Sequence, residues 1–329
     1  MKDKCAIRKT SVGGQALIEG VMMNGPKGAA LSVRHTDGHI ITEMFEVKHA
    51  KDKIKFLGWP FIRGIVNFIE SMIIGYKSLM RSAELSGQLD AEENTEDMSK
   101  LDKWLNDHLG PKFVTAISLV LSVIVALVCG LLFFYAPVYL VDLVDAKLFN
   151  NVLIDFHPLF EGLIKMVIVV CYMILVSQMK DIKRVFMYHG AEHKSIFCYE
   201  KGLDLTVENV RSCKRFHPRC GTSFIFIVLI TSVIVSMLAV IIFPELKQDE
   251  FRLLWTLIKI VAILPLVTGI SYELIRYAGK HDNIITKVFS APGLWMQRIT
   301  TKEPTDDMIE VAIASIKAVI TDNPEDDNL

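Results

Sequence analysis

The stretch FVTAISLVLSVIVALVCGLLFFYAPVYLV, from Phe113 to Val141, decides the fold of this chain. Its 29 residues include no charged side chain, and about 20 apolar residues are enough for a helix to cross the hydrocarbon core of a bilayer. A second uncharged stretch of 22 residues runs from Thr222 to Phe243. Both stretches predict transmembrane helices, so the sequence indicates an integral membrane protein.

Two further stretches are long enough to cross a membrane although each carries a lysine. They run from Leu159 to Met179, with Lys165, and from Phe251 to Tyr272, with Lys259. Each lysine can extend its ammonium group to the membrane surface, and Glu161 lies one helical turn from Lys165, where an ion pair is expected. The predicted fold class is a mostly α polytopic membrane protein with four transmembrane helices.

The distribution of basic residues predicts how the protein is oriented. Residues 180–219 carry nine Lys and Arg, whereas the connections 142–158 and 244–250 carry one lysine each. Basic connections remain in the cytoplasm, so both termini and the 180–221 loop are predicted to be cytoplasmic. The first 50 residues lack the apolar segment of a signal peptide. No nucleic-acid-binding motif accompanies the basic residues, so the lipid bilayer is the expected partner and nucleic acid is not.

Composition and periodicity divide the chain into seven segments. They are a small cytoplasmic β unit (1–53), an amphipathic helix (54–86), an acidic linker (87–112), transmembrane helices one and two (113–179), a basic cytoplasmic loop rich in motifs (180–221), transmembrane helices three and four (222–274), and a cytoplasmic C-terminal segment with a second amphipathic helix (275–329).

The β unit is predicted from an apolar run and two alternating stretches. The run extends from Gln15 to Met23, and residues 29–34 and 39–47 flank a Thr36-Asp37-Gly38 turn. So few strands need a further packing partner. The helix that follows, over residues 60–84, has a polar stripe and an apolar remainder. It fits either a helix lying in the membrane interface or an ordinary helix of a globular core.

The basic loop contains His189-Gly190-Ala191-Glu192-His193, which reads as H-x-x-E-H, the inverted helix motif of zinc hydrolases. On a helix, His189 and His193 are one turn apart on the same face, so both imidazoles can bind one metal ion. Glu192 lies close to that face and is the candidate general base. The alternative without chemistry is a polar, hydrogen-bonded helix end at the membrane surface.

A zinc hydrolase also needs a third protein ligand. The nearest suitable motif is His217-Pro218-Arg219-Cys220-Gly221, at the mouth of the third predicted span, where His217 and Cys220 are both good zinc ligands. Glu200 and Glu208 are closer in sequence and are alternatives. Cys220 acting as a nucleophile with His217 as its base is a weaker interpretation, because the two residues are three apart around a proline.

These motifs resemble those of the YqhQ-like bacterial membrane proteins, a family built around a domain of unknown function and often labelled as predicted metal-dependent enzymes. The resemblance runs from Gly13 to about Ala318. It implies a location in the bacterial cytoplasmic membrane, and it departs from the family at Asn24, where a basic residue is more usual. The motifs that carry it are Gly13–Met23, Arg63-Gly64, Ser82-Ala83, Tyr188–Lys194, Tyr199-Glu200, Leu205–Val210, His217–Phe224, Tyr272-Glu273, Pro292–Leu294 and Thr300–Pro304.

The leading hypothesis is a divalent metal, most naturally zinc, at the cytoplasmic face, with hydrolysis of a membrane-proximal substrate. Its candidate ligands are His189, His193 and either His217 or Cys220, with Glu192 as general base. Arg219, Lys194 and Glu19 are the candidate substrate-binding residues, and the two cations suit an anionic group such as a lipid headgroup.

Two other functions fit the same sequence. The first is a non-enzymatic scaffold or regulatory protein of a membrane or envelope complex, which would bind a membrane-protein partner through its cytoplasmic face. The second is a small transporter, which four spans would support only as a homo-oligomer.

Overall fold

The computed structural model describes residues 9–47, 50–87, 111–150, 152–244, 258–281, 283–321, 323 and 326. Residues 88–110 of the predicted acidic linker, residues 251–257 of the predicted fourth span and most of the chain after residue 321 lie outside the described residues. Within the described residues the fold is mostly helical, with one small antiparallel sheet and four helices that are long and apolar enough to cross a membrane.

The sheet is a meander of four antiparallel strands in the order in which they occur in the chain. The apolar run from Gln15 to Met23 forms two of them, because the chain reverses at Ile18 and Glu19, where Glu19 adopts a positive φ of 49°. The strands are β1 (Gly13–Leu17), β2 (Gly20–Gly25), β3 (Gly28–Arg34) and β4 (Ile40–Phe45).

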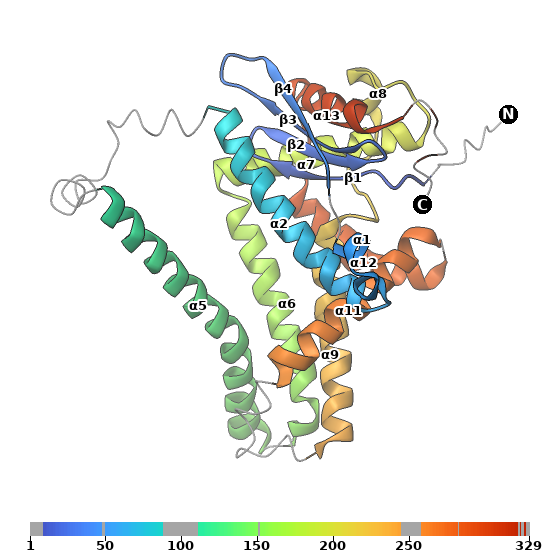
Figure 1. Ribbon diagram of the computed structural model, residues 1–329. Coiled ribbons are helices and arrows are strands. Elements are labelled where there is room, and N and C mark those ends of the chain that lie inside the picture. Colours follow the sequence, from blue (N-terminus) through green and yellow to red (C-terminus); the bar gives the residue numbers. More distant parts are fainter. Residues whose placement is uncertain are drawn as a thin grey trace.

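Helices cover both faces of this sheet, so it is the middle of three layers (Figure 1). Successive side chains of a strand point to opposite faces. Accordingly Val21 and Met23 join a core with α7 (Lys180–Glu200), α8 (Val207–Ser212) and α13 (Asp306–Val319). Met22 and Leu31 join a separate core with α2 (Ile62–Leu85). The β unit thus has packing partners from both ends of the chain.

The membrane-length helices extend away from the sheet (Figure 1). They are α5 (Pro111–Val144), α6 (His157–Val176), α9 (Gly221–Ile242) and α11 (Leu264–Lys280), joined by α12 (Ile284–Thr300). Of these, α9 is central, since it packs against α6, α11 and α12. Glycine permits the closest approaches: a Cβ at Gly162 of α6 would come within 2.0 Å of Val233 on α9. Short helical turns lie at Ala50–Lys53, Lys55–Gly58, Asp145–Phe149, Ile154–Phe156 and Lys259–Ile263.

Each of the four candidate spans overlaps the stretch from which it was predicted. They are Val120–Phe149, His157–Val176, Gly221–Ile242 and Val261–Lys280. The helix of the fourth continues past the expected end near Tyr272 to Lys280, and Glu273 within it forms a bidentate ion pair with Arg63 of α2. In the second span, Lys165 lies 3.6 Å from Glu161, as predicted.

The polar stripe of α2 contacts other parts of the protein. Besides the Arg63 ion pair, Asn67 donates to the Tyr272 hydroxyl at 2.6 Å, and Arg81 forms a bidentate pair with Glu43 of β4. The opposite, apolar side of the helix is exposed, which favours the membrane-interface interpretation over a buried globular helix. Its exposed side chains are Phe68, Ile69, Met72, Ile73, Tyr76 and Met80.

Candidate metal centre

Helix α7 carries the H-x-x-E-H motif at the junction between the sheet and the long helices (Figure 1). The rings of His189 and His193 lie 4.4 Å apart, centroid to centroid, in an edge-to-face arrangement. His193 is buried and His189 is partly exposed. The predicted helix therefore brings the two imidazoles together, with one of them at the edge of the site.

Cys220 completes a cluster of three ligand atoms that all lie within 4.8 Å of one another. Its Sγ is 3.2 Å from His189 Nε2. Cys220 is the N-cap of α9, and its sulfur accepts a hydrogen bond from the Thr222 backbone N–H at 3.5 Å. The positive end of the α9 dipole and this N–H both favour a thiolate.

The hydrogen bonds of the two histidines fix the tautomers that metal binding requires. His189 Nδ1 lies 2.9 Å from the carbonyl oxygen of Thr300, and His193 Nδ1 lies 2.5 Å from that of Arg215. A carbonyl only accepts, so each Nδ1 carries the proton and each Nε2 presents a lone pair. Backbone carbonyls commonly orient metal-binding histidines in this way.

The electrostatics of the cluster lower the pKa values of both His193 and Cys220. Burial lowers the pKa of His193, and the nearby His189 lowers it further. Burial alone would raise the pKa of Cys220. The charge and hydrogen bond of His193, with the hydrogen bonds of Thr222, outweigh that effect and lower the pKa overall. Neutral imidazole and thiolate are the forms that bind a metal.

Glu192 is buried beside this cluster. Burial raises its pKa to about 8, against the opposing influence of His189 and a backbone hydrogen bond from Gly14. Its Oε2 has no hydrogen-bond partner among the described residues. Strand β1 covers it, because a Cβ at Gly14 would lie 3.1 Å from Glu192 Cγ. An enclosed carboxyl with an unsatisfied oxygen is costly, and a cation or a reacting group in the cluster would relieve that cost.

His217 belongs to a separate, neighbouring network. Its Nε2 faces Glu200 at 3.4 Å, while the ring lies 5.7 Å from that of His193. Gln297 of α12, which is fully buried, holds the His217 backbone through two hydrogen bonds of 2.7 Å. Of the two ligands that the sequence left open, the structure brings only Cys220 into the cluster. Glu200 and Glu208 are also outside it.

The three predicted substrate-binding residues are engaged elsewhere in the protein. Arg219 contacts Glu200, and Lys194 is buried with its Nζ 2.7 Å from Glu303 and 2.9 Å from the Arg211 carbonyl oxygen. Glu19 forms a bidentate ion pair with Arg184 and accepts from Tyr188. These side chains tie α7 to the segments around it.

Segment 300–304 supports the centre in a way that the sequence did not reveal. It crosses α7 so closely that a Cβ at Gly190 would lie 2.0 Å from the Lys302 carbonyl oxygen. This close approach places the Thr300 carbonyl oxygen beside His189 Nδ1. It also lets the Lys302 N–H donate a hydrogen bond to the Phe186 carbonyl oxygen at 2.8 Å. The signal was present, since the Thr300–Pro304 motif stood out without an assigned role.

The donor set and its surroundings fit a divalent metal such as zinc. Two imidazoles and a thiolate are typical zinc ligands, and three protein ligands leave one tetrahedral position for a substrate or water. The other cluster of potential ligands in the described residues is His35, Asp37 and His39 on the β3–β4 turn. It lies at the surface, and its members hydrogen-bond with one another.

Together these features define a helical protein with four membrane-length apolar helices and a His/His/Cys cluster beneath a small sheet. The family model described as "Protein of unknown function (DUF1385)" matches residues 59–322, and the chain belongs to this family. It is 36% identical over 311 residues to a protein of Bacillus subtilis (strain 168) described as "Uncharacterized protein YqhQ", covering 94% of this chain and 92% of the relative. No solved structure matches.

Proposed function

We propose that the protein is a zinc-dependent hydrolase of the bacterial cytoplasmic membrane whose metal is held by His189, His193 and Cys220. One observation carries this proposal. Two histidines direct their Nε2 lone pairs to one thiol, and both are fixed in that orientation by backbone carbonyls. A helix end with a purely structural role does not need two histidines that are both oriented toward one cysteine.

Each residue has a defined part in this proposal. A zinc ion held there would supply a Lewis acid for hydrolysis. Glu192, enclosed next to the ligands, is the group that accepts and returns a proton, and its raised pKa places that exchange near neutral pH. The partly exposed His189 marks the side from which a substrate reaches the centre.

We further propose that the sheet and the metal centre lie on the cytoplasmic side. The basic 180–221 segment includes α7, α8 and the start of α9, all at the sheet end of the long helices (Figure 1). The exposed apolar side of α2 lies at the same end, where it would rest in the membrane interface. A substrate with a group at the inner membrane surface is therefore the class that this centre would meet.

A second candidate is a cysteine nucleophile with His189 as its base. It is favoured by the 3.2 Å separation of Cys220 Sγ and His189 Nε2 and by the position of Cys220 at the N-terminus of α9. It replaces the earlier pairing of Cys220 with His217, whose Nε2 faces Glu200. A cysteine nucleophile would give His193, the second oriented imidazole, no role in the reaction.

Alkylation of Cys220 separates the two candidates. Protein purified in mild detergent without chelator is treated with iodoacetamide before and after removal of metal with phenanthroline, and labelling is read at each cysteine by peptide mass spectrometry. The metalloenzyme predicts slow labelling of Cys220 that accelerates at least tenfold after chelation. Fast labelling that is insensitive to chelator would favour the nucleophile and overturn metal ligation.

Glu192→Gln tests the hydrolytic part of the proposal. This variant keeps the shape of the side chain and removes its proton exchange, so metal should be retained while cellular function is lost. Retention of both would overturn the general-base role and favour the scaffold hypothesis, as would a well-folded protein that binds no metal.

A further inference from the structure

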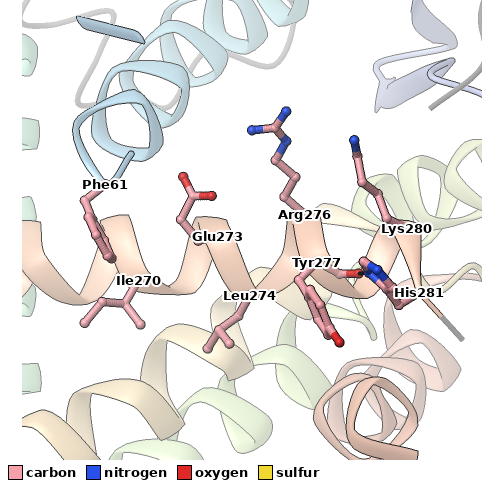
Figure 2. A pocket seen from close by; sticks show the side chains of 8 residues that line it. All are labelled: Phe61, Ile270, Glu273, Leu274, Arg276, Tyr277, Lys280 and His281. Atoms are coloured by element: carbon pink, nitrogen blue, oxygen red, sulfur yellow. Dashed lines mark hydrogen bonds between the residues drawn. The ribbon is translucent and has the colours of Figure 1, made fainter. Parts of the chain in front are cut away.

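A surface pocket at the C-terminal end of α11 combines an apolar floor with unpaired basic groups (Figure 2). Its volume is about 500 Å³, within the roughly 300–1,000 Å³ of small-molecule sites. We propose that this pocket binds the headgroup of an anionic phospholipid of the surrounding membrane. The proposal is independent of the metal centre.

The lining of the pocket changes from apolar to basic along the helix. Phe61 and Ile270 lie at one end, and Lys280 and His281 lie at the other (Figure 2). Helix α11 is apolar near its start and charged at its end. The pocket therefore changes from apolar to basic in the same direction as a bilayer changes from its hydrocarbon core to its surface. A phospholipid has this polarity, with acyl chains beside the apolar residues and its phosphate beside the basic ones.

The charges of the pocket leave a positive end. Glu273 also lines it, but both carboxylate oxygens are held by Arg63 at 2.6 and 2.5 Å, and Arg276 adds a further favourable charge. In the described part of the chain neither Arg276 nor Lys280 forms a salt bridge or hydrogen bond. The two are one helical turn apart and extend from the same side of α11 (Figure 2). This spacing suits a shared phosphate.

One ring stack and two hydrogen bonds order the basic end. The Tyr277 and His281 rings stack at 4.2 Å with 21° between their planes. His281 Nδ1 lies 3.1 Å from the Tyr277 carbonyl oxygen, so Nδ1 donates and Nε2 remains available. The Tyr277 hydroxyl accepts from Asn283 at 3.2 Å. Basic side chains near a helix C-terminus also offset the helix dipole, but the dipole explains neither the pocket nor its apolar half.

The expected headgroup site differs from the one that the sequence suggested. Arg219 and Lys194 were the candidate cations for an anionic lipid, and both are held by internal carboxylates. Arg276 and Lys280 are exposed at the end of a membrane-length helix instead. Anionic lipids concentrate at such positions.

Lipid retention measured by native mass spectrometry tests the proposal. The full-length protein is titrated in mixed micelles with phosphatidylglycerol or with phosphatidylcholine, and the Arg276→Gln/Lys280→Gln variant is compared with Lys180→Gln/Lys183→Gln. The control removes the same charge from exposed lysines at the start of α7. We expect the first variant to weaken phosphatidylglycerol binding by about tenfold or more, and the control to change it by less than about twofold.

Three results would overturn the proposal. Equal effects of the two double variants would mean nonspecific charge attraction. Equal retention of the two lipids would mean that the anionic charge is not recognised. Displacement of the lipid by inorganic phosphate at the same concentration would mean a plain anion site. Thermal melting and zinc content of both variants should match those of the wild type. If the first variant is misfolded, Arg276→Lys/Lys280→Arg, which keeps the charge, must retain the lipid.

Discussion

Gly190→Ala should damage both the fold and the metal centre, although alanine is the better helix former. In α7 the substitution would by itself gain about 1 kcal/mol of helix propensity. The added Cβ would lie 2.0 Å from the Lys302 carbonyl oxygen. Segment 300–304 would therefore have to retreat by roughly 1 Å or more to restore an ordinary carbon–oxygen contact.

The retreat has a calculable cost. It breaks or strains the hydrogen bonds from His189 Nδ1 to the Thr300 carbonyl and from the Lys302 N–H to the Phe186 carbonyl, each contributing about 1 kcal/mol. Overpacking adds about 1–3 kcal/mol. After the propensity gain is subtracted, the net loss is about 2–4 kcal/mol, which corresponds to a melting midpoint lowered by roughly 5–10 °C.

Thermal melting of the detergent-solubilised protein measures this loss, and zinc content measured alongside should fall because His189 loses its orienting carbonyl. Gly130→Ala is the matched control, since nothing lies within 4 Å of a Cβ at that position of α5. The control should leave the midpoint unchanged or slightly raised. A Gly190→Ala protein as stable and as rich in zinc as the control would refute the reasoning.

Three further predictions follow from the packing and charges of single residues. Gln297→Leu leaves the buried N–H and carbonyl of His217 unpaired and should lower the free energy of unfolding by about 3 kcal/mol; a loss below about 1 kcal/mol in chemical denaturation would contradict this role. Arg63→Gln and Glu273→Gln should couple by about 1 kcal/mol in a double-mutant cycle, because the pair is partly exposed; additive effects would mean that the ion pair does not join α2 to α11. Burial, with the neighbouring Cys213, raises the pKa of Cys198 from 9.0 to about 12. The buried thiol therefore stabilises the fold fully below pH 9, and this contribution is lost as the pH rises towards 12. Iodoacetamide should leave Cys198 unlabelled at pH 8 in the native protein and label it after denaturation.

Hydropathy predicted the membrane-length helices well because each is a local property of some 20 residues. Each of the four candidate spans overlaps the uncharged or nearly uncharged stretch that predicted it. Within the fourth, Glu273 forms an ion pair with Arg63, which is more than 200 residues away in the sequence. No local pattern reveals such an ion pair.

Helix α12 was missed for a similar reason. Pro292 and Gly293 lie inside it, and this dipeptide usually marks a break. Here Gly293 is needed for close packing, since a Cβ there would come within 2.2 Å of Ser223 on α9. A tertiary contact thus overrides a local signal.

The sequence predicted two ligands of the candidate centre and left the third open. Helical spacing was enough to place His189 and His193 on one face. The choice between His217 and Cys220 was not accessible, because Gln297 and Glu200 decide which way the His217–Cys220 turn presents its side chains. Arg219 and Lys194 looked free in sequence, and the carboxylates that hold them became visible only in the fold.

Metal content tests the central claim most directly. Full-length protein purified without a chelator or a histidine tag should contain about one zinc ion per chain by elemental analysis. His189→Ala/His193→Ala should contain almost none, while His35→Ala/His39→Ala, which removes the histidines of the other cluster, should retain it. A well-folded wild type without metal, or a content that falls only with His35 and His39, would contradict the account.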